Sequence, residues 1–167
     1  LSNERKIFFI ASILFASLFI LLVFSVSSPS VTAPSSYVSN LTRESYSDLL
    51  HTYEVTRYPS SAQLISPYSS SEGLVLGFNA DPTNLHFGII PGNGSYVSRF
   101  VNLTNRGEDA KLYMKTYGNI SPFVNYSMNS FILRKGEKRV VDVKFDTGRV
   151  LSGSYEGEID IIVQKPK

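Results

Sequence analysis

The residues that could perform catalysis are few and scattered in this chain of 167 residues. The two histidines, His51 and His86, lie in different segments, and neither has a serine or carboxylate at a spacing typical of a catalytic site. Cysteine is absent, which excludes disulfides and thiolate metal sites. We therefore expect no enzymatic activity, no cofactor and no metal centre.

Carboxylates near the end of the chain alternate with apolar residues, and this is typical of a solvated strand face. No Asp/Asn-rich loop of the kind that surrounds calcium occurs, and Pro91-Gly92-Asn93-Gly94 indicates a hairpin turn and not a phosphate-binding loop. The net charge of +2 gives no reason to expect nucleic acid as a partner. These alternating carboxylates are Asp142, Asp146, Glu156, Glu158 and Asp160.

Five Asn-x-Ser/Thr sequons offer a different chemistry, the attachment of glycans. Sequons mark surface positions in secreted chains, and we expect at least two of them to be modified. The alternative is that a composition rich in Asn and Ser produced them by chance. The predicted glycosylation sites are Asn40, Asn93, Asn102, Asn119 and Asn125.

An apolar run organises the rest of the chain. Ile7–Val26 holds twenty residues without charge, Pro or Gly, and a helix of that length reaches about 30 Å, the thickness of a bilayer's hydrocarbon core. Arg5 and Lys6 precede the run, so the positive-inside rule places the N-terminus in the cytoplasm and residues 27–167 at the cell surface. A cleaved secretory signal is the alternative, although its apolar core usually has only about 7 to 15 residues.

Small residues on this helix indicate a contact between copies. Ser12 and Ala16 form a small-xxx-small pair, which lets helix backbones approach closely. Five phenylalanines are spread almost all round the helix, which suits lipid and equally suits a helix buried among copies of itself.

The chain opens Leu1-Ser2-Asn3-Glu4 without an initiator Met, so we expect an upstream piece that is either removed or simply precedes Leu1. Leu-Ser-x-Glu before an apolar helix resembles the mature start of archaeal type IV pilin-like proteins. The resemblance implies that the helix forms the core of a filament. It also implies that Glu4 pairs with the terminal amine of a neighbouring subunit.

A Ser/Pro-rich linker is expected over residues 27–72. Within it, residues 40–58 carry apolar groups at a partly helical spacing, which leaves a short helix or an extra strand open. The Pro- and Ser-rich residues 59–73 that follow indicate another loop. A plain spacer is the simplest interpretation of this segment, and donation of a strand to a neighbour is the alternative.

From Gly73 onward the apolar period changes to two, which predicts short antiparallel strands that form a β-sandwich over residues 73–167. Leu74, Leu76 and Phe78 open the series, and Val141, Val143 and Phe145 are typical of its later strands. A strand ending in Asn-x-Gly, a Gly-Glu hairpin and a last strand with Gly-x-Tyr-x-Gly resemble the immunoglobulin-like modules of archaeal and bacterial surface proteins. The predicted class is thus mainly β, with an N-terminal hydrophobic helix over residues 1–26.

Two functions fit these features. The first is a structural subunit of a pilin-like surface filament, with helices packed in the core, glycosylated sandwiches outside and the chain itself as partner. The second is a membrane-anchored ectodomain that binds the cell-wall layer or another envelope protein, as accessory proteins of archaeal motility machines do. Arg5 and Lys6 suit this second function, because they fit the cytoplasmic face of a membrane better than a filament core.

Overall fold

The computed structural model describes residues 8–17, 33–66, 83–150 and 152–167, and it divides the chain into two units, Leu1–Ala33 and Pro34–Lys167. In the first unit, residues 8–17 form an α-helix within the predicted apolar run. Residues 18–26 of that run lie outside the described residues. In the ranges given above, no helix is both long enough and apolar enough to cross a membrane.

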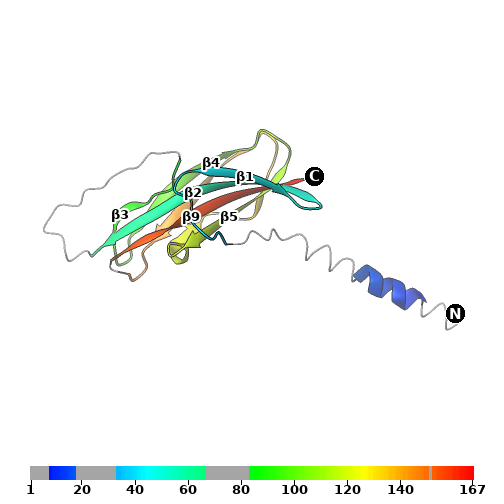
Figure 1. Ribbon diagram of the computed structural model, residues 1–167, viewed down its shortest axis with the longest axis horizontal. Helices are drawn as coiled ribbons and strands as arrows, with labels where there is room; N and C mark the ends of the chain where they lie inside the picture. Colours follow the sequence, from blue (N-terminus) through cyan, green and yellow to red (C-terminus); the bar gives the residue numbers. More distant parts are fainter. Residues whose placement is uncertain (1–7, 18–32, 67–82, 151) are drawn as a thin grey trace. The chain divides into compact units, whose positions relative to one another are not determined.

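The second unit is built from two β-sheets. The larger sheet has the strand order β1-β2-β9-β5-β7, with β3 added beside β2 (Figure 1). Its long central strands β2 and β9 are antiparallel, with a register that runs from His51 opposite Pro166 to Leu64 opposite Gly153. Only β3 is parallel to its neighbour among the strand pairs of the described residues. The strands are β1 (Thr42–Ser47), β2 (His51–Ile65), β3 (Gly88–Pro91), β5 (Ala110–Gly118), β7 (Phe131–Leu133) and β9 (Gly153–Pro166).

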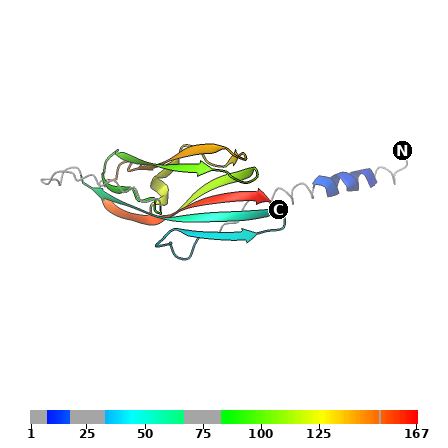
Figure 2. The same ribbon diagram turned by 90° about the horizontal axis from the view of Figure 1, so that it is seen from above.

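The smaller sheet lies over one face of the larger one, and Figure 2 shows the two as separate layers. Its order is β4-β8-β6, with β4 at Tyr96–Thr104, β6 at Val124–Tyr126 and β8 at Lys138–Asp146. A short 3-10 turn, Ser121–Phe123, precedes β6.

Side chains from both sheets form the core between the layers. The predicted alternation is confirmed on β8, where Val141, Val143 and Phe145 are completely buried. The Phe145 ring centre lies 5.4 Å from that of Phe87 and 5.5 Å from that of Phe123. Full burial of one such side chain contributes about 1.5–3 kcal/mol. The prediction of a mainly β, antiparallel chain with an N-terminal helix is confirmed. The predicted strand at Leu74–Phe78 lies outside the described residues.

Of the two alternatives for residues 40–58, the structure shows the strand, because β1 and β2 belong to the larger sheet. The loop predicted over residues 59–73 is wrong as far as Ile65, where β2 ends. Pro59 lies inside β2, at a point on its edge between the end of β1 and the start of β3. Its carbonyl accepts a hydrogen bond from the Leu85 N–H and so points away from β9. The amide hydrogen that proline lacks is therefore not needed for the pairing of β2 with β9.

The hairpin predicted at Pro91-Gly92-Asn93-Gly94 is also wrong. β3 pairs with β2 in the larger sheet and β4 pairs with β8 in the smaller one, so this segment crosses between the sheets. The chain nevertheless turns sharply here, since Asn93 and Gly94 have positive φ values of 61° and 89°. The Gly94 N–H donates to Thr147 Oγ1 at 3.0 Å, which fixes the crossing to the end of β8.

Candidate functional site

The carboxylates of β9 form the most unusual chemical group in the described residues. Glu158 and Asp160 point to the face of the larger sheet that lies opposite the core, where the sequence predicts solvent. Glu158 is 0% exposed and Asp160 is 2% exposed, so that prediction is wrong for both. Glu156, two residues earlier, is exposed as expected.

Arg57 of β2 neutralises this buried charge. It lies opposite Asp160 in the register, and its guanidinium donates to Glu158 Oε1 from Nη2 at 2.8 Å and from Nε at 3.1 Å. Its Nη1 donates to Glu44 Oε1 on β1, also at 3.1 Å. Hydrogen-bonded arginine–carboxylate pairs of this kind are strong and directional, and they make the burial of Glu158 possible.

The cover over this cluster comes from residues 34–41, which we call the strap. The Val38 N–H donates to Glu158 Oε2 at 2.9 Å, and Arg57 Nη2 reaches the Ser36 carbonyl at 3.5 Å. A single carboxylate of β9 thus joins the strap to the guanidinium of β2.

Asp160 is held differently. Burial raises the pKa of its carboxyl to about 7, and the negative charge of Glu158 acts in the same direction. Its Oδ1 lies 3.9 Å from Arg57 Nε and has no hydrogen-bond partner in the described part of the chain. The cluster is closed to solvent and Glu158 is already bound by Arg57, so we interpret it as a structural ion pair and not as a substrate site. The described residues contain no group of three or more His, Asp or Glu side chains placed to hold a metal ion.

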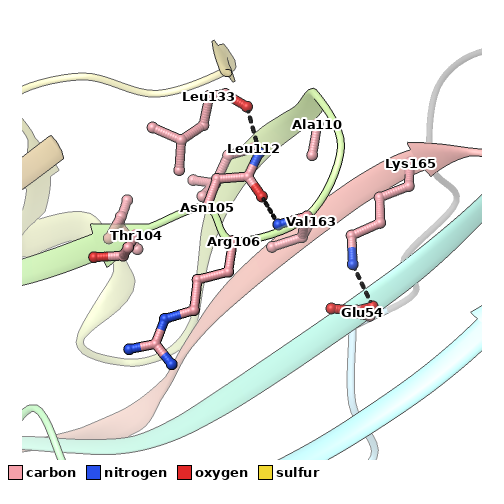
Figure 3. A pocket seen from close by; sticks show the side chains of 11 residues that line it. Glu54, Thr104, Asn105, Arg106, Ala110, Leu112, Leu133, Val163 and Lys165 are labelled. Atoms are coloured by element: carbon pink, nitrogen blue, oxygen red, sulfur yellow. Dashed lines mark hydrogen bonds and ion pairs between the residues drawn. The ribbon is translucent and has the colours of Figure 1, made fainter. Parts of the chain in front are cut away.

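A cavity of about 310 Å³ opens at the end of the unit where β4 leads into β5 (Figure 3). The side chain of Asn105 stabilises one wall of this cavity. Its Nδ2 donates to the carbonyls of Glu108 at 2.7 Å and Leu133 at 2.8 Å. Lys165 and Glu54 form an ion pair of 2.5 Å at its side. The apolar lining comes from both sheets and consists of Leu103, Ala110, Leu112, Leu133 and Val163.

The structure places all five sequon asparagines at exposed positions. Asn102 and Asn125 lie on the outer face of the smaller sheet, opposite Val140 and Lys144 of β8. Asn119 differs, because its Oδ1 accepts from the Glu156 N–H at 2.6 Å and its Nδ2 contacts the Ser154 carbonyl at 3.4 Å. Asn40 and Asn93 lie outside the strands.

The predicted subunit-contact residues are described only in part. Ser12 and Ala16 are both exposed, four residues apart in the helix at residues 8–17, so they share one face. Glu4 lies outside the described residues.

One side-chain pair is not foreseen from the sequence. His86 Nδ1 lies 2.8 Å from Ser61 Oγ, although the two residues are 25 positions apart. In the part of the chain that the structure describes, no carboxylate hydrogen-bonds to this imidazole, so the third group that orients a catalytic base is missing. His51 is separate and lies 3.7 Å from Asp48 Oδ1.

Comparisons with protein-family models, with curated proteins and with solved structures gave no match.

Proposed function

We propose that this protein is the structural subunit of a pilin-like surface filament, with its apolar helix in the filament core. The observation that carries the proposal is the exposure of the helix at residues 8–17. Phe8 is 78% exposed, Phe9 68% and Phe15 72%, and Ile10, Ile13 and Leu14 are exposed as well. Apolar side chains on all sides of a helix need an apolar environment, and helices of other copies provide one.

We propose that the second unit is an immunoglobulin-like sandwich that forms the outside of the filament. Two facing antiparallel sheets with an apolar core between them support this assignment. The turn between β7 and β8, Lys135-Gly136-Glu137, has the Gly-Glu sequence of such modules, and Gly136 has a φ of 77°. Exposed sequons on this unit are consistent with a glycan-coated outer surface.

The test is the replacement Glu4→Ala in cells that express the full chain. We expect surface filaments to disappear while the protein remains in the membrane fraction, because the carboxylate is assigned to the amine of the next subunit. Glu108→Ala, at an exposed loop position, serves as the matched control and should leave filaments intact. Filaments of unchanged number and length in the Glu4→Ala strain would refute this role of Glu4.

The second candidate is a membrane-anchored ectodomain that binds an envelope partner, and Arg5 and Lys6 favour it. In this case detergent should release the protein as a small oligomer, and shearing should yield no filaments. Electron microscopy of sheared material, together with sedimentation of detergent extracts, distinguishes the two candidates.

A further inference from the structure

The turn between β1 and β2 presents two leucines to solvent. Leu49 is 84% exposed and Leu50 is 44% exposed. Hairpin turns usually carry Gly, Asn or Asp at these positions, because tight turns favour positive φ. Neither leucine adopts a positive φ, and neither belongs to the core. The composition of this turn is therefore not explained by folding of the described residues.

Asp48 makes the turn rigid. Its Oδ1 accepts from the Leu50 N–H at 2.8 Å and the His51 N–H at 2.7 Å, while Oδ2 accepts from the Tyr53 hydroxyl at 2.8 Å. The Leu50 carbonyl in turn accepts from the Lys167 N–H at 3.1 Å, which ties the turn to the end of the chain. A rigid turn loses little conformational entropy when it binds, so these contacts preorganise the two leucines for a partner.

The cavity described above lies at the same end of β2 and β9 as this turn. Glu54 of β2 and Lys165 of β9, which flank the cavity, are only a few positions from Leu50 and from the Lys167 amide that Leu50 binds. One end of the unit therefore carries both an exposed apolar projection and an open cavity with an apolar floor and a polar rim that includes Glu54, Arg106 and Lys165. The volume of about 310 Å³ accommodates a leucine side chain.

We propose that a second copy of this chain is the partner, and that Leu49 of each copy inserts into the cavity of the other. Projection and cavity lie at the same end, so each copy can give and receive the same contact around a two-fold axis. The contact uses only residues of the second unit. It goes beyond the proposed function, because it links two outer units whether or not their helices form a filament.

The absence of cysteine makes the contact testable by disulfide cross-linking of the full chain in detergent. Leu50→Cys combined with Arg106→Cys, at the cavity wall, keeps Leu49 intact and should give a covalent dimer on mild oxidation. Leu50→Cys combined with Ile89→Cys is the matched control. Ile89 is 44% exposed like Leu50 but lies on β3, which pairs with the opposite end of β2, so little dimer should form.

Adding Leu49→Ser to the cross-linking pair should lower the dimer yield about tenfold. The reason is that serine has little apolar surface to bury in the cavity of the other copy. Adding Ile89→Ser instead should leave the yield unchanged. Equal yields with and without the Leu49→Ser replacement, or no dimer from the Leu50→Cys/Arg106→Cys chain, would overturn the proposal.

Two further arms separate this contact from filament assembly and from lipid binding. Cross-linking should persist in a Glu4→Ala background, so loss of filaments and loss of this contact are distinguishable. A polarity-sensitive dye on Leu50→Cys reports on lipid as the alternative partner. A blue shift with anionic phospholipid vesicles and no protein cross-link would show that the turn inserts into a bilayer, and it would overturn the proposal.

Discussion

The two faces of strand β9 differ in what buries them. Ile159 and Ile161 face the smaller sheet and are covered by apolar side chains. Glu158 and Asp160 face the other way and are covered by the strap and by Arg57. The apolar face is stabilised by many small, interchangeable contacts, whereas the polar face depends on a few specific partners. Loss of one group should therefore be felt more strongly on the polar face.

The largest expected effect is that of Glu158→Ala. This change leaves the Arg57 guanidinium, only 16% exposed, without its main partner and leaves the Val38 N–H unpaired. Removal of one member of a buried ion pair costs about 3–5 kcal/mol of unfolding free energy. Urea unfolding of the full chain in detergent, followed by tyrosine fluorescence because the chain has no Trp, measures the loss.

Glu156→Ala is the matched control, since Glu156 lies on the same face of the same strand but is exposed. Its effect should stay within about 0.5 kcal/mol. If the two variants lose equal stability, the polar face does not depend on the pair.

The next effect is a pH dependence that belongs to Asp160. Its pKa is raised from 3.8 to about 7, so the folded protein binds this proton more tightly than the unfolded chain does between these values. The stabilisation is fully present below about pH 4 and is lost as the pH rises through about 7. The slope is at most about 1.4 kcal/mol per pH unit.

Asp160→Asn should remove this slope and make the protein more stable than the parent at pH 8. Glu156→Gln is the control and should keep the parent's profile. Unfolding free energies measured from pH 4 to pH 8 decide between these outcomes. The assignment is contradicted if the unfolding free energy of the parent rises between pH 5 and pH 7 and Asp160→Asn abolishes that rise.

The smallest effect is expected on the apolar face. Ile159→Val removes one methylene from a completely buried side chain and should cost about 0.5–1.5 kcal/mol. The same unfolding measurement applies. A loss as large as that of Glu158→Ala would erase the difference between the two faces.

The apolar face of the sheets could be predicted from the sequence because its signal is local. Alternation at Val141, Val143 and Phe145 identifies a strand and the side that it buries, and the structure agrees. The same alternation at Glu158 and Asp160 predicts a solvated face, and there the prediction is wrong. The group that covers Glu158 is the Val38 amide, 120 positions away, and no local pattern carries that information.

The strand β2 could not be predicted from the sequence for a related reason, because its Pro and Ser residues are typical of a loop. Pro59 normally ends a strand, but here it lies where one edge of β2 has no strand partner. The cavity is equally inaccessible to sequence reasoning, since Leu103 and Val163 line it from different sheets. The sequence shows two adjacent apolar residues at Leu49 and Leu50. The rigidity of their turn depends on the Asp48 contacts, which only the structure reveals.

If Asn119 is glycosylated as proposed, the contacts of its side chain set an order of events during biosynthesis. Its amide holds the Glu156 N–H and contacts the Ser154 carbonyl, so it joins the end of β5 to the start of β9. A glycan on Nδ2 attaches most easily before those two strands meet, while Asn102 stays accessible afterwards on the outer face of β4. The ratio of glycan occupancy at Asn119 to glycan occupancy at Asn102 would then report the rate of glycan transfer relative to the rate of folding.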